Sequence, residues 1–465
     1  MKLFKLKGLA FVSVCILGIF LVWVSYANAE TLRDSVLSAM KTNPSVKSMQ
    51  YARDATHYDI RQAKGAYLPR VDAIAGAGTG YYSHVGSRDS DGYAAATSLT
   101  SARPADWMHR WQGSLVAAQL ICDGGNTKYK VRSTEHVFNS NDFRFIDSAE
   151  VVGLDAIIAH MSVIRERALV DLSKENVDVH KEILSFLSDR QKKGAQSLAD
   201  VTQTEGRLSL TLATLSDMEK NLDAVIANYH RVTGIAVAST LEMGKSPSVP
   251  IGVDNTLQRI MAKNPKLAAY KEEIEAAKSN IKYAKSYYWP TIRAEAALDY
   301  RDGYQDSTYF TRDMSLMVIA NWNLYRGGSD LAAVRAATQR ELQAQETLRN
   351  VSEVLVEQAN SFWSEYISYK EQTALFEQAV DFSQRTLEMY WQQFNVAQRS
   401  LLDVLDAQNE LYNSKSRLVT SQVNELIAAY RLLTLCGELA YTFDITKSDY
   451  DTFAPMPGSV NDKLN

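Results

Sequence analysis

A group of charged side chains late in the chain has a spacing that could support chemistry. Arg399, Asp403, Asp406 and Glu410 are separated by four, three and four residues, so a helix would carry all four on one face. Carboxylates that stand close together repel each other, raise each other's pKa and attract cations. The spacing by itself is more typical of a solvated helix face with an ordinary Arg–Asp pair, and both interpretations stay open.

The usual signatures of an enzyme or of a metal site are missing from the sequence. The 7 histidines are scattered, without a His-x-x-x-His pair or a nearby cysteine ligand. No Gly-x-Ser-x-Gly motif occurs, and no Walker lysine follows Gly124-Gly125 or Gly327-Gly328. The formal net charge of -4 provides no basic field for nucleic acid. We therefore expect no enzyme, no cofactor, no metal and no nucleic-acid partner.

The first 29 residues are typical of a secretory signal peptide. Three lysines precede an apolar segment from Gly8 to Val24, and Ala27-Asn28-Ala29 forms a small-x-small cleavage site. Beyond Ala29 no apolar run approaches the roughly 18 residues of a spanning helix. The mature chain is expected to leave the cytoplasm, and if it crosses a membrane it must do so as strands.

Long helices are indicated by the positions of the prolines. The chain has 9 prolines, and residues 105–246 and 291–454 contain none of them. Because a proline inside a helix costs about 3 kcal/mol, these two tracts predict very long helices. They also argue against an all-β sandwich with many turns.

The chain is a tandem repeat. Asn43-Pro44 returns as Asn264-Pro265 at an offset of 221 residues, and Gly124-Gly125 returns as Gly327-Gly328 at an offset of 203. The difference between the two offsets indicates an insertion in the first copy, which we place in an exposed loop at 83–106. Each copy is expected to contain a helix, two strands, a very long helix and a return helix.

The predicted organisation has six parts. They are a signal peptide at 1–29; a first copy at 30–235 with a helix at 30–67, strands at 70–82 and 108–122, a long helix at 126–193 and a helix at 197–234; a linker at 236–253; a second copy at 254–437 with a helix at 254–288, strands at 291–303 and 312–325, a long helix at 329–394 and a helix at 399–436; and a tail at 438–465.

Strands are predicted where the apolar residues begin to alternate. Apolar residues of the second copy alternate with polar ones over two stretches of about 11 residues, which matches a transmembrane hairpin. The strands of the first copy alternate poorly and are assigned from the repeat. Four strands cannot close a barrel, because the smallest bacterial barrels have about 8. The alternating residues are Ile292, Ala294, Ala296, Leu298 and Tyr300, then Met314, Leu316, Val318, Ala320, Trp322 and Leu324.

Helix lengths predict a hollow helical cylinder. The helix at 126–193 would be about 100 Å long at 1.5 Å per residue. The helices at 30–67 and 197–234 together reach a similar length, so they can stack end to end beside it. The predicted fold class is mainly α with a β-barrel contribution, built from long coiled-coil hairpins and four transmembrane strands per chain.

The repeat, together with one string of residues in its second copy, resembles a known family. The string Arg399-Ser-Leu-Leu-Asp403-Val-Leu-Asp406-Ala-Gln-Asn-Glu-Leu-Tyr412-Asn413-Ser-Lys415, in a repeat behind a signal peptide, closely resembles the TolC family of outer-membrane channels. The resemblance covers the chain from about residue 30 to about residue 440. Its motifs are specific in combination and weak singly.

The resemblance implies an assembly and a location. It implies a homotrimer whose strands complete a 12-stranded barrel in the lipid of a Gram-negative outer membrane, above a periplasmic α-barrel. It also implies two partners, a periplasmic adaptor protein and an inner-membrane transporter of ABC or RND type.

The resemblance also assigns a periplasmic gate. Asp403 and Asp406 match the family's paired aspartates, which become six carboxylates around the axis of a trimer. Arg399 matches the basic residue before them, and Asp200 is the equivalent aspartate of the first copy. Phe394 replaces the family's usual tyrosine, so a tyrosine hydrogen bond cannot hold this gate closed. We expect Arg399 to bond to Asp200 or its neighbours across the helix pair.

The two hairpin turns are expected to contact the adaptor. An alternative interpretation, a simple turn with Gly194 as the helix cap, is about equally good for any one residue. We expect the tail after residue 437 to be a peripheral or disordered extension. The expected contact residues are Gly194, Ala195, Ser197 and Leu198 in the first turn, and Ser400 and Leu401 in the second.

Three functions remain open. The absence of a lipid-attachment cysteine and the closeness of the gate string favour the exit duct of a type I protein secretion system. The alternative within the same class is the outer-membrane component of a multidrug efflux pump. A periplasmic coiled-coil scaffold belongs to a different class, and it would explain the helices but not the alternating strands at 291–325.

Overall fold

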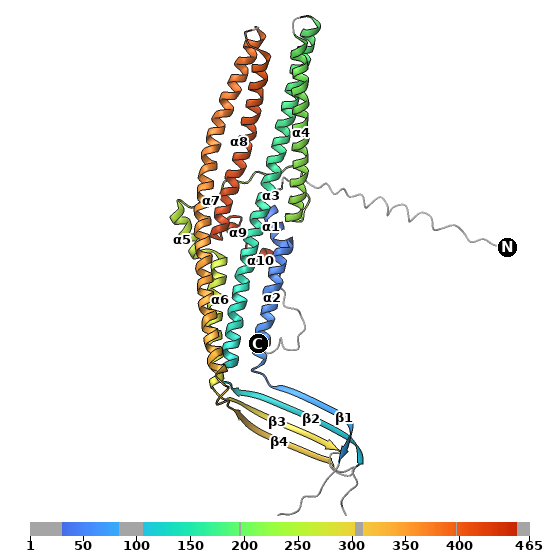
Figure 1. Ribbon diagram of the computed structural model, residues 1–465, viewed down its shortest axis with the longest axis vertical. Helices are drawn as coiled ribbons and strands as arrows, with labels where there is room; N and C mark the ends of the chain where they lie inside the picture. The colour runs from blue at the N-terminus through green and yellow to red at the C-terminus, as the bar shows by residue number, and fades with distance from the viewer. Residues whose placement is uncertain (1–29, 83–105, 195–196, 303–309, 397, 453–465) are drawn as a thin grey trace, which may run out of the picture.

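The computed structural model describes residues 30–82, 106–194, 197–302, 310–396 and 398–452. The chain is elongated, with helices along most of its length and one four-stranded sheet at one end (Figure 1). This confirms the predicted mainly helical fold class with its small antiparallel sheet. The predicted signal peptide at 1–29, almost all of the predicted loop at 83–106, and Ala195 lie outside the described residues.

Each copy begins with two helices where the sequence predicts one. The break falls at Asn43 and at Asn264, which both directly precede a proline. A proline disfavours the helical region for the residue before it, and both asparagines are extended and cap the next helix through the side-chain oxygen. The prediction of single helices at 30–67 and 254–288 is therefore wrong. The helices are α1 (Leu32–Thr42), α2 (Pro44–Gly65), α5 (Val253–Lys263) and α6 (Pro265–Lys285), followed by the 3-10 turn η1 (Ser286–Tyr288).

Each copy contains one long helical hairpin, and the two hairpins have the same design. The long helix has 67 residues and the return helix 36 residues in both copies. A serine caps each return helix, and each return helix ends at a glycine with φ of 72°, a conformation that favours glycine. The helices are α3 (Asn126–Lys192) and α4 (Leu198–Thr233) in the first copy, and α7 (Ser329–Asn395) and α8 (Leu401–Cys436) in the second.

The shorter helices stack end to end beside the long ones (Figure 1). The asparagine of each proline break makes this junction in both copies. Asn43 Nδ2 donates to the carbonyl oxygen of Val232 at 3.2 Å, and Asn264 Nδ2 donates to that of Leu435 at 2.9 Å. The break in the first helix therefore has a structural role, since it places an asparagine side-chain amide where it can donate to a carbonyl group at the end of the return helix.

The sheet is antiparallel and its strands follow the order β1-β2-β3-β4. Within the described chain, β1 and β4 each have one neighbour, so each leaves an edge of backbone groups unpaired. The prediction that the last strand reaches residue 325 is wrong, because β4 ends at Asn321 and the chain then turns toward α7. The strands are β1 (Arg70–Tyr82), β2 (Asp106–Cys122), β3 (Thr291–Asp302) and β4 (Phe310–Asn321).

Strand register separates the sheet into an apolar and a polar face. Leu298 pairs with both Leu115 and Met314, so apolar side chains share one face across three strands. On the other face Asp299 lies between Ser114 and Asp313. In β1 the residues on the polar face include three glycines, which is why the sequence alternates poorly there. A Cβ at two of them, Gly76 and Gly80, would collide with the side chains of Gln112 and Arg110.

The described part of the tail belongs to the folded core. Residues 438–452 contain α9 (Leu439–Thr442) and α10 (Lys447–Tyr450), and the side chains of Leu439 and Tyr450 are 0% and 4% exposed. The Tyr450 ring lies 5.5 Å from the ring of Phe145 on α3. The prediction of a peripheral or disordered extension is therefore wrong for these residues. No helical or strand period could reveal them, since both helices have only four residues.

A buried carboxylate holds the tail against α3. Glu150 accepts hydrogen bonds from the backbone N–H groups of Leu439 at 2.9 Å and Ala440 at 3.0 Å. Burial raises the pKa of Glu150 to about 7, and the two backbone hydrogen bonds partly oppose that shift. The tail thereby joins the end of the second copy to the long helix of the first.

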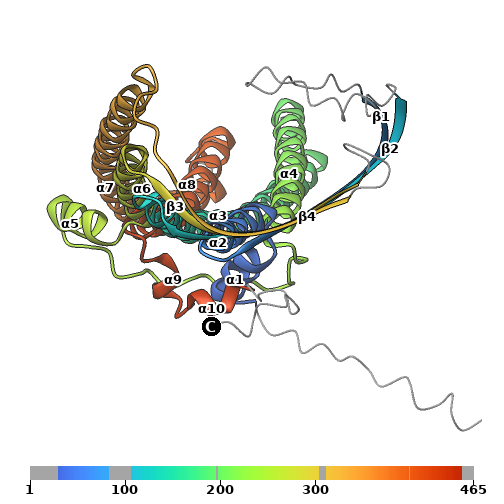
Figure 2. The same ribbon diagram turned by 90° about the horizontal axis from the view of Figure 1, so that it is seen from below.

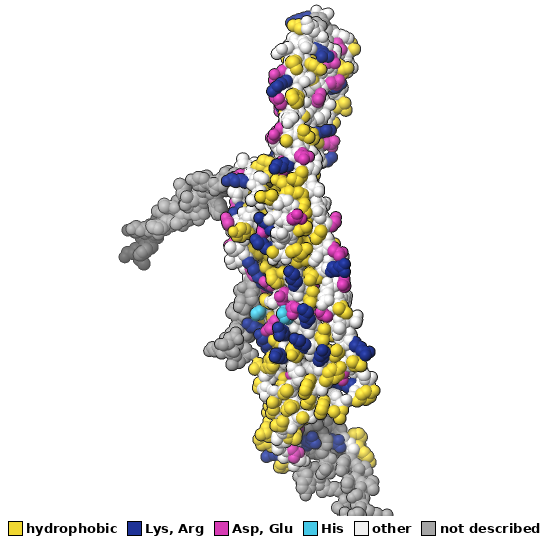
Figure 3. Space-filling model, turned by 90° about the vertical axis from the view of Figure 1, so that its left-hand side faces the viewer, with side chains coloured by type: hydrophobic (Ala, Val, Ile, Leu, Met, Phe, Trp, Pro, Cys, Tyr) yellow, Lys and Arg dark blue, Asp and Glu magenta, His cyan; other side chains and the backbone are white. Residues whose placement is uncertain are grey.

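The chain as a whole is curved. Seen along its length, the helices and the sheet form an arc, with α1, α9 and α10 on the convex side (Figure 2). Hydrophobic side chains gather over the sheet end in the view of Figure 3, while charged side chains are spread over the helices. None of the described helices is both long and apolar enough to cross a membrane.

Candidate functional site

The predicted gate and turn residues lie at the end of the molecule that is farthest from the sheet. The turn between α3 and α4 and the turn between α7 and α8 form two separate tips there (Figure 1). The 67-residue helices span about 100 Å at 1.5 Å per residue. The chain therefore has an apolar sheet at one end and charged hairpin tips at the other.

A small hydrophobic cluster joins the two hairpins near the tips. It contains side chains from α3 and α4 of one hairpin and from α7 and α8 of the other, so it fixes the two hairpins against each other. We refer to it as the tip cluster, and its buried members are Ile183, Leu187, Val201, Phe394, Leu401, Val404 and Leu405.

Phe394, the predicted gate residue without a hydroxyl, belongs to this cluster. Its side chain is 6% exposed, and its ring lies 5.9 Å from the ring of Trp391 and 6.3 Å from that of Phe186. The Arg190 guanidinium is 5.9 Å from the ring centroid, within the range of a cation–π contact. Phe394 therefore contributes packing between helices at this position.

Arg399 makes its described contacts within its own hairpin. Its guanidinium lies 4.1 Å from the centroid of the Tyr390 ring, its Nε donates to Gln393 Oε1 at 3.1 Å, and it is 3.7 Å from Asp403. Asp200 lies in the first turn of α4. The bond between Arg399 and Asp200 stays a prediction.

Asp403 caps the helix on which it lies. Its carboxylate accepts from the Ser400 hydroxyl at 2.8 Å and from the Ser400 backbone N–H at 3.3 Å, while its own N–H donates to the Ser400 hydroxyl oxygen at 3.2 Å. This reciprocal arrangement is a capping box. Asp403 thus has a structural role, and its side chain is still 38% exposed.

Asp406 is joined to the other hairpin by Arg207, a residue that the sequence patterns do not single out. Arg207 on α4 lies 2.8 Å from the Asp406 carboxylate on α8. Arg207 stands at the position of the first copy that corresponds to Glu410, since the two are 203 residues apart. The offset of 203 residues could have identified Arg207 as the basic counterpart of Glu410. Only the structure shows which carboxylate Arg207 contacts.

The two turns differ in what they expose. Gly194 ends the first long helix with φ of 73°, and Ser197 and Ser400 cap the return helices. Leu198 is 67% exposed, whereas its counterpart Leu401 is 5% exposed in the tip cluster. Leu198 is therefore available to a partner, while Leu401 is covered by its own chain in this conformation.

The opposite end of the molecule presents a surface suited to lipid. The apolar face of the sheet has exposed side chains on all four strands, and exposed aromatic side chains lie near the strand ends. Aromatic girdles at both ends of an apolar band are typical of membrane-spanning strands. The exposed aromatic residues are Tyr81, Trp107 and Phe310 toward one end, and Tyr67, Trp289 and Trp322 toward the other.

One buried polar group resembles a catalytic arrangement. The Ser35 hydroxyl lies 2.8 Å from His160 Nδ1 and 2.8 Å from the Tyr229 hydroxyl. All three side chains are 0% exposed, so no substrate reaches them. Among the residues that the structure describes, no group of three or more His, Cys, Asp and Glu side chains could hold a metal ion.

Comparison with known proteins matches most of the chain to one family. The profile of the family described as outer membrane efflux protein matches residues 36–228 and 256–438, which together include most of both copies. Outer membrane efflux protein BepC of Brucella suis is 24% identical over 89% of this chain and 86% of its own length. Outer membrane protein TolC of Escherichia coli is 23% identical over 89% of this chain and 84% of its own length.

More distant matches extend the comparison. Alkaline protease secretion protein AprF of Pseudomonas aeruginosa is 22% identical over 64% of each chain. Among solved structures, the CmeC outer membrane channel of Campylobacter jejuni superposes with a TM-score of 0.75 at 13% identity, over 88% of this chain and 86% of that one. At that identity the match shows a shared fold.

Proposed function

The chain belongs to the outer membrane efflux protein family, and from this premise we propose that three copies form one exit duct for a tripartite export system. Proteins of this family are channels of the Gram-negative outer membrane with a large periplasmic tunnel, and they are not enzymes. They work together with adaptors and inner-membrane transporters. The localisation and the absence of catalysis therefore apply to this chain.

One observation carries the proposal of a trimer. The sheet is open at β1 and at β4, although its apolar face suits lipid. Unpaired backbone groups are too costly inside a bilayer, so a spanning sheet must close on itself. Three copies would join each β1 edge to the β4 edge of the next copy and give a barrel of 12 strands, a size within the bacterial range.

We also place the gate of the duct at the tips. In a trimer, Asp403 and Asp406 would ring the periplasmic entrance with six carboxylates. The tip cluster and the Arg207–Asp406 ion pair would hold the two hairpins of each chain together in the closed state. The exposed Leu198 turn would be free to contact the adaptor.

The proposed cargo is protein, exported by a type I system with an ABC transporter. Its support is the gate string at 399–415 and the match to AprF, a relative named for alkaline protease secretion. The alternative, efflux of small toxic compounds with an RND-type transporter, is favoured by the match to BepC over a larger share of the chain. A scaffold without a membrane part is disfavoured, because it leaves the apolar face of the sheet in water.

Deletion of the gene and restoration from a plasmid test the cargo. Loss of one or a few secreted proteins from the medium, restored by the wild-type chain, is the expected result. Export should be lost because protein secretion of this type has no other route across the outer membrane. A deletion strain that secretes every protein normally but becomes sensitive to detergents and dyes would contradict protein export and support the efflux alternative.

A further inference from the structure

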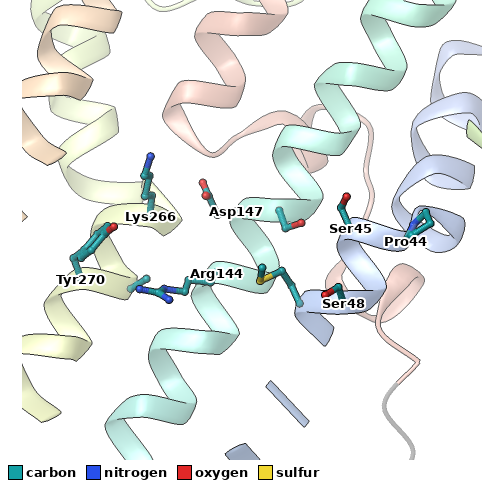
Figure 4. A pocket seen from close by; sticks show the side chains of 10 residues that line it. Pro44, Ser45, Ser48, Arg144, Asp147, Lys266 and Tyr270 are labelled. Atoms are coloured by element: carbon teal, nitrogen blue, oxygen red, sulfur yellow. The ribbon is translucent and has the colours of Figure 1, made fainter. Parts of the chain in front are cut away.

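A hollow of about 640 Å³ lies where α3 passes between α2 and α6. We refer to it as the α3 hollow. Its walls carry charges of both signs and several hydroxyl groups, which come from three helices (Figure 4). The charged and serine side chains among the lining residues are Ser45 and Ser48 of α2, Arg144, Asp147 and Ser148 of α3, and Lys266 of α6.

The repeat places matching positions on the two sides of the α3 hollow. Three lining positions of α2 return at the offset of 221 residues as lining positions of α6, so the hollow lies at a junction with approximate internal symmetry. The side chains at these positions have diverged, and a lysine stands where the first copy has a serine. The pairs are Ser45 with Lys266, Ser48 with Ala269, and Met49 with Tyr270.

The charges on α3 are not a requirement of this fold. The helix α7 holds the same place in the second copy, and its equivalents of the three α3 lining residues are found at the offset of 203. They are Thr347, Asn350 and Val351, none of which is charged. The same helix geometry is therefore built with neutral side chains, so the fold by itself does not explain why α3 carries a charge at Asp147.

Two charged groups in the α3 hollow have unused bonding capacity. Among the described residues, the side chains of Asp147 and Lys266 make no hydrogen bond and no ion pair within 4.0 Å. Burial raises the pKa of the Asp147 carboxyl above its ordinary value, and Lys266 partly opposes this shift. In Figure 4 the Lys266 and Asp147 side chains extend from neighbouring helices toward the same region, with Ser45 across α3 from Lys266.

Arg144 is already satisfied by the protein. It forms an ion pair with Glu273, and its guanidinium lies 5.8 Å from the centroid of the Tyr270 ring. Arg144 therefore forms a wall of the α3 hollow, while Asp147 and Lys266 are the groups left to meet a ligand. One carries a negative charge and the other a positive charge.

The α3 hollow opens on the concave side of the chain. The tail covers the convex face of α3 at Phe145, Glu150 and Gly153. At about 100° per residue, the three α3 lining residues point about 180° away from that face. In the proposed trimer the concave side faces the tunnel (Figure 2). Only this placement in the tunnel wall rests on the proposed function, because the hollow itself belongs to one chain.

We propose that the α3 hollow binds a small zwitterion, a molecule that presents an ammonium group to Asp147 and a carboxylate to Lys266. The serine hydroxyls around the two charges supply further donors and acceptors. A free amino acid or a short peptide has this chemistry. Three such sites, one per chain, would line the tunnel between the membrane and the gate.

Binding of glycylglycine to the detergent-solubilised protein tests this proposal, with saturation-transfer NMR as the readout. The wild-type protein should bind the dipeptide more tightly than it binds ethylamine or acetate, which each carry one of the two charges. Asp147→Asn and Lys266→Ala should each weaken dipeptide binding about tenfold or more, the loss of roughly one charge-assisted contact. Asn350→Ala, at the equivalent position of α7, should leave binding unchanged.

Three results would overturn the zwitterion site. They are no dipeptide binding to wild-type protein, equal binding by Asp147→Asn and wild type, and ethylamine binding as tight as that of the dipeptide. Unchanged helical circular dichroism of each variant shows that it is folded. Because these measurements need no membrane and no transport, their failure would leave the proposed duct untouched.

Discussion

Replacing Phe394 with alanine is expected to open the periplasmic end of the duct and to raise its single-channel conductance several-fold. The ring is 6% exposed and packs within the tip cluster between the two hairpins. Removing a buried phenylalanine side chain costs about 3–5 kcal/mol. Much of this lost free energy should come from the contact between the hairpins, because the tip cluster contains side chains from α3, α4, α7 and α8.

A second phenylalanine on the same helix provides the control. Phe382 is 62% exposed, so Phe382→Ala should leave conductance and thermal stability close to those of the wild type. Phe394→Leu keeps most of the buried volume and should be intermediate. Equal conductance of Phe394→Ala and wild type in planar bilayers, with both proteins folded, would show that the tip cluster does not hold the gate.

The second large effect is expected for Arg207→Ala. Arg207 and Asp406 are 2.8 Å apart and link the two hairpins, with side chains 28% and 60% exposed. Exposed pairs contribute about 0.2–1 kcal/mol each, so three pairs that break together would favour the open state by about 0.6–3 kcal/mol. The open probability should rise between about 3-fold and 100-fold, since 1.4 kcal/mol is a factor of ten.

Salt dependence and a matched variant test whether the effect of Arg207→Ala comes from the loss of its ion pair. Because dissolved salt screens exposed charges, the difference between Arg207→Ala and wild type should shrink from 0.1 M to 1 M KCl. Lys220→Ala is the control, since Lys220 lies on the same helix and its ion pair, with Asp217 one turn away, stays within α4. An Arg207→Ala channel with wild-type open probability at both salt concentrations would rule out the ion pair as a closing contact.

Much of the architecture could be predicted from patterns that repeat along the sequence. The proline-free tracts and the two offsets predicted the long hairpins, since a helix that lacks breakers over many turns has few other conformations. The break at Asn43 was visible in the sequence as an Asn-Pro pair, but its use appears only when Asn43 reaches Val232. The first-copy strands were hard to recognise, because Gly76 and its neighbours accommodate side chains from β2.

The candidate site was harder to predict than the fold. The spacing of Asp403 and Asp406 predicts a shared helix face, while the cap that Asp403 forms is indicated by a different spacing, the Ser-x-x-Asp pattern that begins at Ser400. The partner of Asp406 depends on how α4 lies against α8, which no local pattern encodes. Leu401 is covered for the same reason, since its burial comes from helices far away in the sequence.

The most direct measurement is the block of single channels by a trivalent cation added at the periplasmic end. A trimer with six aspartates around one entrance predicts a wild-type pore that is blocked from that side only. The channel with both Asp403→Asn and Asp406→Asn should lose the block while remaining conductive. A wild-type protein that forms no pore, or a double variant that is blocked as strongly as the wild type, would contradict the proposed gate at the centre of the duct.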